Sequence, residues 1–134
     1  MAREFWNRRN VPVVVALSML AVLGCRDTTK VRYMYANPTV EHAVVTAQGR
    51  VIESVIVVQL PDPCWSFLES GARVVGNVVT VEPVYRRAYA AICPAVVVSD
   101  TTTVRVEVTE SGTYNVVFPH RTPAVPELNP VLVE

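Results

Sequence analysis

Valine, gathered in short runs, is the feature that most restricts what this chain can fold into. From residue 25 to the C-terminus, 25 of the 110 residues are valine. Valine is branched at Cβ, which limits its rotamers in a helix and suits the pleated surface of a strand. Residues 103–109 alternate strictly, with valines on one face and polar residues on the other, which predicts a strand with one buried side. We therefore expect an all-β domain.

Turn residues divide this valine-rich region into separate strands. A strand over 50–60 begins after Gln48-Gly49 and ends at the prolines that follow, because proline cannot donate to a ladder. Gly76-Asn77 separates two further runs and predicts a β-hairpin. Pro83 in its second arm indicates an edge or a bulge. About seven short strands over 43–118 predict an antiparallel β-sandwich, with a small closed β-barrel as the alternative.

A short apolar strand is expected over 94–98, with a turn at Ser99-Asp100. Four of the ten prolines lie between Phe118 and Val131. We expect 119–134 to be a proline-rich extended tail, with a possible short strand at its end.

The first 24 residues form a different kind of segment and predict export. Three arginines and one acid precede an apolar run from Val11 to Gly24. A basic head, a short apolar core and small residues at its end are typical of a secretory signal peptide. The fourteen residues of this run are fewer than the about 20 that a spanning helix needs. We expect 1–24 to be a signal peptide, cleaved or kept as an anchor.

The apolar run ends in "VLGC" at 22–25. This tetrapeptide resembles the lipobox of bacterial prolipoproteins, in which the cysteine becomes the lipidated first residue of the mature protein. The resemblance implies that Cys25 carries acyl chains such as palmitate, and that the protein is membrane-anchored on the periplasmic or cell-surface side. Arg26, in place of an aspartate, favours the outer membrane. The polar stretch 25–42 would then be a lipidated tether.

Three cysteines in an exported chain require an explanation, because an odd number leaves one unpaired. Lipidation of Cys25 leaves Cys64 and Cys93, 29 residues apart, as a pair. Disulfides persist in the oxidising space outside the cytoplasm, so we expect this pair to be bonded. The alternative, a metal or reactive-thiol site, needs more ligands at close spacing.

The motif "ESGTYNV" at 110–116 resembles the entry to a late strand in immunoglobulin-like and fibronectin type III domains. The resemblance implies an immunoglobulin-like β-sandwich in which Gly112 and Tyr114 are structural. Tyr114 would be a tyrosine corner, its hydroxyl hydrogen-bonded to nearby backbone. Val116 stands where an antibody-type domain has its second cysteine, so the Cys64–Cys93 bridge would instead fasten a loop to the start of a strand.

Catalytic chemistry finds little support in the sequence. The serines do not lie in a nucleophile elbow, two histidines offer few general bases, and the zero net charge gives no reason to expect nucleic acid binding. We expect no enzyme activity, metal or cofactor, but a membrane-anchored lipoprotein acting as a protein-binding or structural module. The alternatives are an accessory subunit of a larger membrane-protein complex, and an inhibitor or carbohydrate-binding module.

The best candidate for binding a protein partner is the segment Pro83–Cys93. It carries Tyr85, Arg86, Arg87 and Tyr89, residue types that are over-represented at interface hot spots. Fixing its end through the disulfide would lower the entropy lost on binding. The alternative places both arginines on the solvated face of a strand and both tyrosines in the core.

Overall fold

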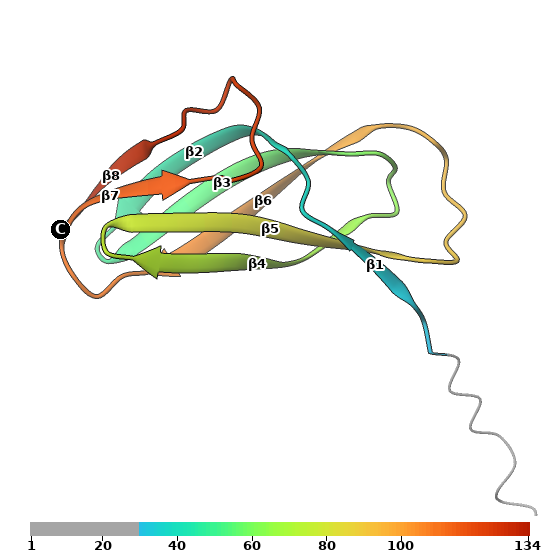
Figure 1. Ribbon diagram of the computed structural model, residues 1–134, viewed down its shortest axis with the longest axis horizontal. Coiled ribbons are helices and arrows are strands. Elements are labelled where there is room, and N and C mark those ends of the chain that lie inside the picture. Colours follow the sequence, from blue (N-terminus) through green and yellow to red (C-terminus); the bar gives the residue numbers. More distant parts are fainter. Residues whose placement is uncertain (1–29) are drawn as a thin grey trace, which may run out of the picture. The chain divides into compact units, whose positions relative to one another are not determined.

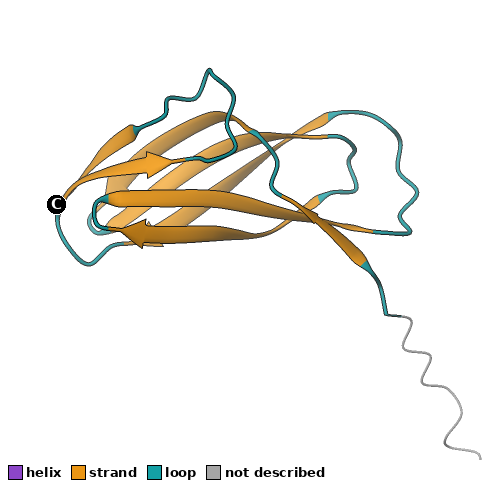
Figure 2. Cartoon of the chain, viewed as in Figure 1, coloured by secondary structure: helices purple, strands orange, loops and turns teal. Residues whose placement is uncertain are grey.

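The computed structural model describes residues 30–134, and every regular element in them is a β-strand (Figure 2). None of these residues forms a helix long and apolar enough to cross a bilayer. The predicted signal peptide, the lipobox and Cys25 lie outside the described residues. The eight strands are β1 (Tyr33–Ala36), β2 (Val40–Gln48), β3 (Val51–Leu60), β4 (Ser66–Val75), β5 (Val78–Ala88), β6 (Val98–Glu107), β7 (Gly112–Val117) and β8 (Asn129–Val133).

The strands form two sheets that pack on each other as a β-sandwich (Figure 1). One sheet has the order β2-β3-β6. In the other, β5 has β4 on one side and both β7 and β1 on the other, and β8 pairs with β7. All pairs are antiparallel except β5–β7. The predicted all-β sandwich is confirmed, and the two sheets do not join into a closed barrel.

The core consists of the inward faces of the strands, and its residues follow the two-residue period. In β3 every second residue from Ile52 to Leu60 is buried, and β3 lies between β2 and β6 as the central strand of its sheet. In β5 the buried face includes Val79, Val81 and Tyr85. Burying one such side chain stabilises the fold by about 1.5–3 kcal/mol. Valine content and alternation therefore account for most of the core.

The hairpin predicted at Gly76-Asn77 joins β4 to β5, and Val75 pairs with Val78 across it. Gly76 has a φ of 60°, a left-handed conformation that glycine adopts without strain. Pro83 lies where β5 has β4 on one side only, because β7 pairs with residues 78–80 and β1 with residues 85–88. The position is locally an edge, so the missing N–H breaks no ladder bond.

The sandwich extends beyond the expected limits of 43–118 at both ends. β1 and the start of β2 lie in the expected tether, and β8 lies in the expected extended tail. Val125 and Val133 of that tail are buried in the core. The backbone of His120 and Thr122 bonds to Val40 and closes one flank of the sandwich. The prolines exclude helix, but the apolar residues between them still gain free energy by covering the sheets.

Candidate functional site

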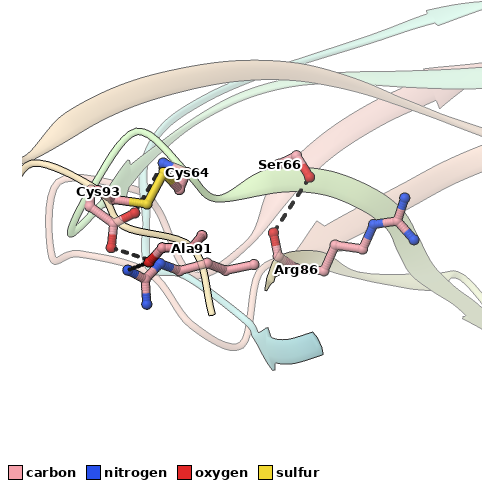
Figure 3. A network of polar contacts seen from close by, with 7 residues as sticks. Cys64, Ser66, Arg86, Ala91 and Cys93 are labelled. Carbon is pink, nitrogen blue, oxygen red and sulfur yellow. Dashed lines mark hydrogen bonds and ion pairs between the residues drawn. A yellow bond between two sulfur atoms is a disulfide. The ribbon is translucent and has the colours of Figure 1, made fainter. Parts of the chain in front are cut away.

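A disulfide between Cys64 and Cys93 joins two connections at one end of the sandwich (Figure 3). Cys64 follows β3 and precedes β4, whereas Cys93 lies between β5 and β6. The predicted disulfide is confirmed, and it joins the turn just before β4 to the loop between β5 and β6. Asp62 lies near both sulfurs, but because the sulfurs are bonded to each other, they offer no thiolate to a metal.

Asp62 and Arg87 form a partly buried ion pair beside the disulfide. Oδ2 of Asp62 lies 3.3 Å from Nε of Arg87, and the two side chains are 14% and 19% exposed. The other carboxylate oxygen of Asp62 accepts a hydrogen bond from the backbone N–H of Cys64. Nη2 of Arg87 donates to the carbonyl of Ala91 at 3.2 Å. Arg87 therefore holds the chain after β5, and its role is structural.

Tyr85 is fully buried between the sheets. Its hydroxyl donates to Oδ2 of Asp100 at 2.7 Å, and its ring packs edge-to-face on Phe67 at 5.6 Å between ring centroids. Burial, together with the bond to Asp100, raises the pKa of Tyr85 above its ordinary value. This corrects the prediction that Tyr85 contacts a partner. Its alternation with Val79 and Val81 was the signal for its burial.

Arg86 faces outward from β5 and packs on β1. Its guanidinium lies 4.9 Å from the ring centroid of Tyr33, a cation–π arrangement. Its backbone carbonyl accepts a weak hydrogen bond from Ser66 at 3.4 Å (Figure 3). Of the four predicted partner-binding residues, Tyr89 is the most open to solvent. The four predicted residues therefore have different surroundings. Tyr85 lies in the core, Arg86 and Arg87 contact neighbouring segments, and Tyr89 is exposed to solvent.

The segment from Tyr89 to Val97, which we call the 89–97 loop, carries the apolar surface that the sequence did not reveal. The side chain of Ile92 is fully exposed, and those of Tyr89, Val96 and Val97 are also exposed. The expected strand over 94–98 is absent before Val98, and Ser99-Asp100 lies inside β6 instead of in a turn. The only sequence signal for this surface was an apolar run without alternation. Such a run is as consistent with a buried strand as with an exposed loop.

The 89–97 loop is held at several points although it has no regular structure. The disulfide fixes its middle at Cys93, and Arg87 binds the carbonyl of Ala91. At its base the N–H of Tyr89 donates to the carbonyl of Arg32 at 2.8 Å, just before β1. The loop thus presents apolar side chains to solvent from a restrained backbone.

Gly112 and Tyr114, the residues of the expected tyrosine corner, lie at the start of β7, at the opposite end of the sandwich from the 89–97 loop (Figure 1). The hydroxyl of Tyr114 donates to the carbonyl of Glu110 at 3.0 Å, which is the contact that the resemblance implies. Gly112 has a φ of 140°, a conformation that L-residues rarely adopt. Both residues support the strand entry and lie away from the 89–97 loop.

No family model, curated protein or solved structure matches this chain.

Proposed function

We propose that this chain is an exported, lipid-anchored envelope protein whose β-sandwich is a non-catalytic protein-binding module. The observation that carries the proposal is the 89–97 loop, in which four apolar side chains face solvent while the backbone is fastened to the fold. Large exposed apolar groups gathered in one place mark interaction sites more often than they occur without function.

The restraints on the loop suit it to binding. Ordering a free loop consumes part of the free energy of association, and a pre-ordered loop avoids that loss. Tyr89 adds a flat ring with a hydroxyl, a residue type enriched at hot spots. Ile92 stands beside Cys93, where the disulfide fixes the backbone. The loop can therefore insert Ile92 into an apolar pocket of a partner.

The proposed anchor would limit how far this loop can lie from a membrane. Cys25 precedes Arg32 by seven residues, which span at most about 25 Å when fully extended. Arg32 in turn bonds to Tyr89 at the base of the loop. Lipid on Cys25 would keep the loop close to the bilayer surface, within reach of partners in the same envelope. The Cys64–Cys93 disulfide supports an oxidising compartment.

Intact mass spectrometry of protein extracted from its native membrane tests the anchor. We expect a mature chain that begins at an acylated Cys25. A Cys25→Ala variant should lack the lipid and leave the membrane fraction after cell lysis, unless the signal segment is retained. A mature N-terminus at another residue, or an unmodified Cys25, would remove lipidation from the proposal.

Extraction in mild detergent followed by sizing tests the loop. We expect a partner to co-purify with the wild-type chain and to be lost from a Tyr89→Ser, Ile92→Ser double variant. Leu132→Ser is the matched control, because Leu132 is an exposed aliphatic residue on β8 and its loss should leave capture intact. Release in both variants would show a nonspecific effect and contradict the assignment.

The same loop variants distinguish a protein partner from lipid. Unlipidated Cys25→Ala protein is mixed with vesicles of phosphatidylethanolamine and phosphatidylglycerol and sedimented. We expect little binding. Strong binding that disappears with the Tyr89→Ser, Ile92→Ser change would assign the loop to the bilayer surface and overturn its role in protein binding.

A further inference from the structure

The edge of β6 differs from the other sheet edges in residues 30–134, because its pairing register is unbroken and its outer side pairs with no other strand. β6 pairs with β3 in unbroken register along all ten residues, and it contains neither proline nor lysine. β4 carries a register shift after Phe67. β8 has five residues, including Pro130, and β1 has four. β2 has a register shift after Val40, where 120–122 also covers it.

An edge of this kind is exposed to pairing by another strand. In an antiparallel ladder, every second residue directs its N–H and C=O away from the partner strand, so β6 offers a row of these groups to the surroundings. Proteins usually blunt such edges with bulges, prolines, charges or short strands. Of these, β6 has only charges, at Asp100, Arg105 and Glu107. The three threonines at 101–103 also favour the extended conformation.

The inward face of β4, on the same flank as β6, is incompletely covered. Phe67 is opposite Tyr85 on β5 and Val74 is opposite Val79, so each pair shares a face of the sheet. Phe67 and Val74 are 37% and 43% exposed, whereas their partners on β5 are 0% exposed. The three-stranded sheet therefore ends before it covers β4. A fourth strand beside β6 would extend this sheet on the flank where β4 lies.

We propose that the free edge of β6 accepts an extended strand from a partner protein, which becomes the fourth strand of the β2-β3-β6 sheet. Main-chain hydrogen bonds to β6 would supply much of the affinity, as in other cases of strand addition. Alternate apolar side chains of the strand would cover Phe67 and Val74. The inference rests on the proposed protein-binding function and specifies how the partner binds.

The 89–97 loop is continuous with this edge. Val96 and Val97 are exposed and immediately precede Val98, the first residue of β6. One extended segment can therefore touch the loop and then pair along β6. A second copy of this chain fits less well, because its own β6 would bring a second Asp100 carboxylate to the inward face, where β6 already holds one.

The experiment uses the full-length chain in detergent micelles and a soluble synthetic peptide that alternates valine and threonine over the length of β6, ten residues. Amide hydrogen exchange is followed by NMR with and without the peptide. We expect slower exchange at every second residue of β6, because only those amides point to the free edge. Uniform slowing, slowing confined to β4 or β8, or no change at saturating peptide would overturn the proposal.

Two lysine variants place the effect on the correct face of β6. Thr102 is half-buried on the inward face, and Thr103 is exposed on the outward face. We expect Thr102→Lys to weaken peptide binding by about tenfold or more, since it sets a charge where the added strand must pack. Thr103→Lys should bind normally. Equal binding by both variants would overturn the proposal that the added strand packs on the inward side of β6.

Val74→Lys provides a second reading in case Thr102→Lys does not fold. Val74 is already substantially exposed on β4, so this change should preserve the fold while weakening peptide binding. Sedimentation velocity tests for a second copy. Concentration-dependent dimers that protect the same alternate amides without peptide would show self-pairing and overturn the partner-strand proposal.

These results separate the inference from the proposed function. If the peptide binds β6 but Cys25 is unmodified, β6 remains a strand acceptor and the lipid anchor is removed from the proposed function. If the peptide binds β6 but the 89–97 loop variants still capture a partner, β6 remains a strand acceptor and the loop is removed as the binding site. If the peptide does not bind β6 but partner capture still depends on the 89–97 loop, only the strand-acceptor inference is removed.

Discussion

The hydroxyl of Tyr85 on β5 donates a hydrogen bond to Oδ2 of Asp100 on β6 at 2.7 Å, and this bond links the two sheets through the core. Tyr85 thereby satisfies the one polar atom of an otherwise apolar, fully buried side chain. Asp100 lies on the strand whose outer edge is free. The bond therefore fixes the inner side of the same strand that is proposed to accept a partner.

Replacing Tyr85 with phenylalanine should destabilise the fold by about 1–3 kcal/mol, because the Asp100 carboxylate loses its partner in a partly buried position. Urea unfolding monitored by circular dichroism measures this change. Tyr89→Phe is the control and should alter stability by about 0.5 kcal/mol or less, since Tyr89 is exposed. Equal effects in the two variants would show that the Tyr85–Asp100 bond contributes nothing specific.

Stability should fall as the pH rises above about 10, the ordinary pKa of tyrosine. Burial and the bond to Asp100 raise the pKa of Tyr85 in the folded state, so the unfolded chain loses this proton first. The contribution is complete below pH about 10 and declines by about 1.4 kcal/mol per pH unit up to the raised pKa. Urea unfolding between neutral and alkaline pH should show a weaker decline for Tyr85→Phe, and an unchanged decline would contradict this origin.

Loss of the disulfide should lower the free energy of unfolding by about 3–4 kcal/mol on the chain-entropy model for a separation of 29 residues. Cys64→Ser and chemical reduction of the wild type should give similar losses in urea unfolding. Cys25→Ser retains the bridge and should unfold as the wild type does in the same detergent. In the native protein, Cys64 and Cys93 should resist alkylation until they are reduced. Free thiols at both positions would contradict the structure.

Arg87→Met should loosen the 89–97 loop, because it removes the ion pair with Asp62 and the bond to the Ala91 carbonyl while keeping the apolar stem. We expect faster amide exchange in the loop and a loss of about 1–3 kcal/mol. Arg105→Met is the matched control. Its ion pair with Glu53 is shorter, 2.7 Å, but the Arg105 side chain is 71% exposed, so its loss should change stability by about 1 kcal/mol or less. Unchanged loop exchange in Arg87→Met would show that the disulfide alone orders the loop.

The strand content and the hairpin at Gly76-Asn77 were predictable because their causes are local. Alternation sets which residues of a strand share a face, and a glycine with positive φ sets the turn. The pairing of Cys64 with Cys93 was predicted by counting cysteines in a chain expected to be exported. The burial of Tyr85 could also have been predicted, since it continues the Val79 and Val81 face.

The sequence alone determined an all-β fold with a valine core, since the two-residue period and β-branched side chains act within each strand. Tertiary structure alone decided the parallel pairing of β5 with β7, the docking of the proline-rich tail, and the free edge of β6. Those features depend on which strands meet across long separations in sequence. An apolar run such as the 89–97 loop has the same local pattern whether a neighbour covers it or solvent does, and only the packing of the other strands leaves it exposed.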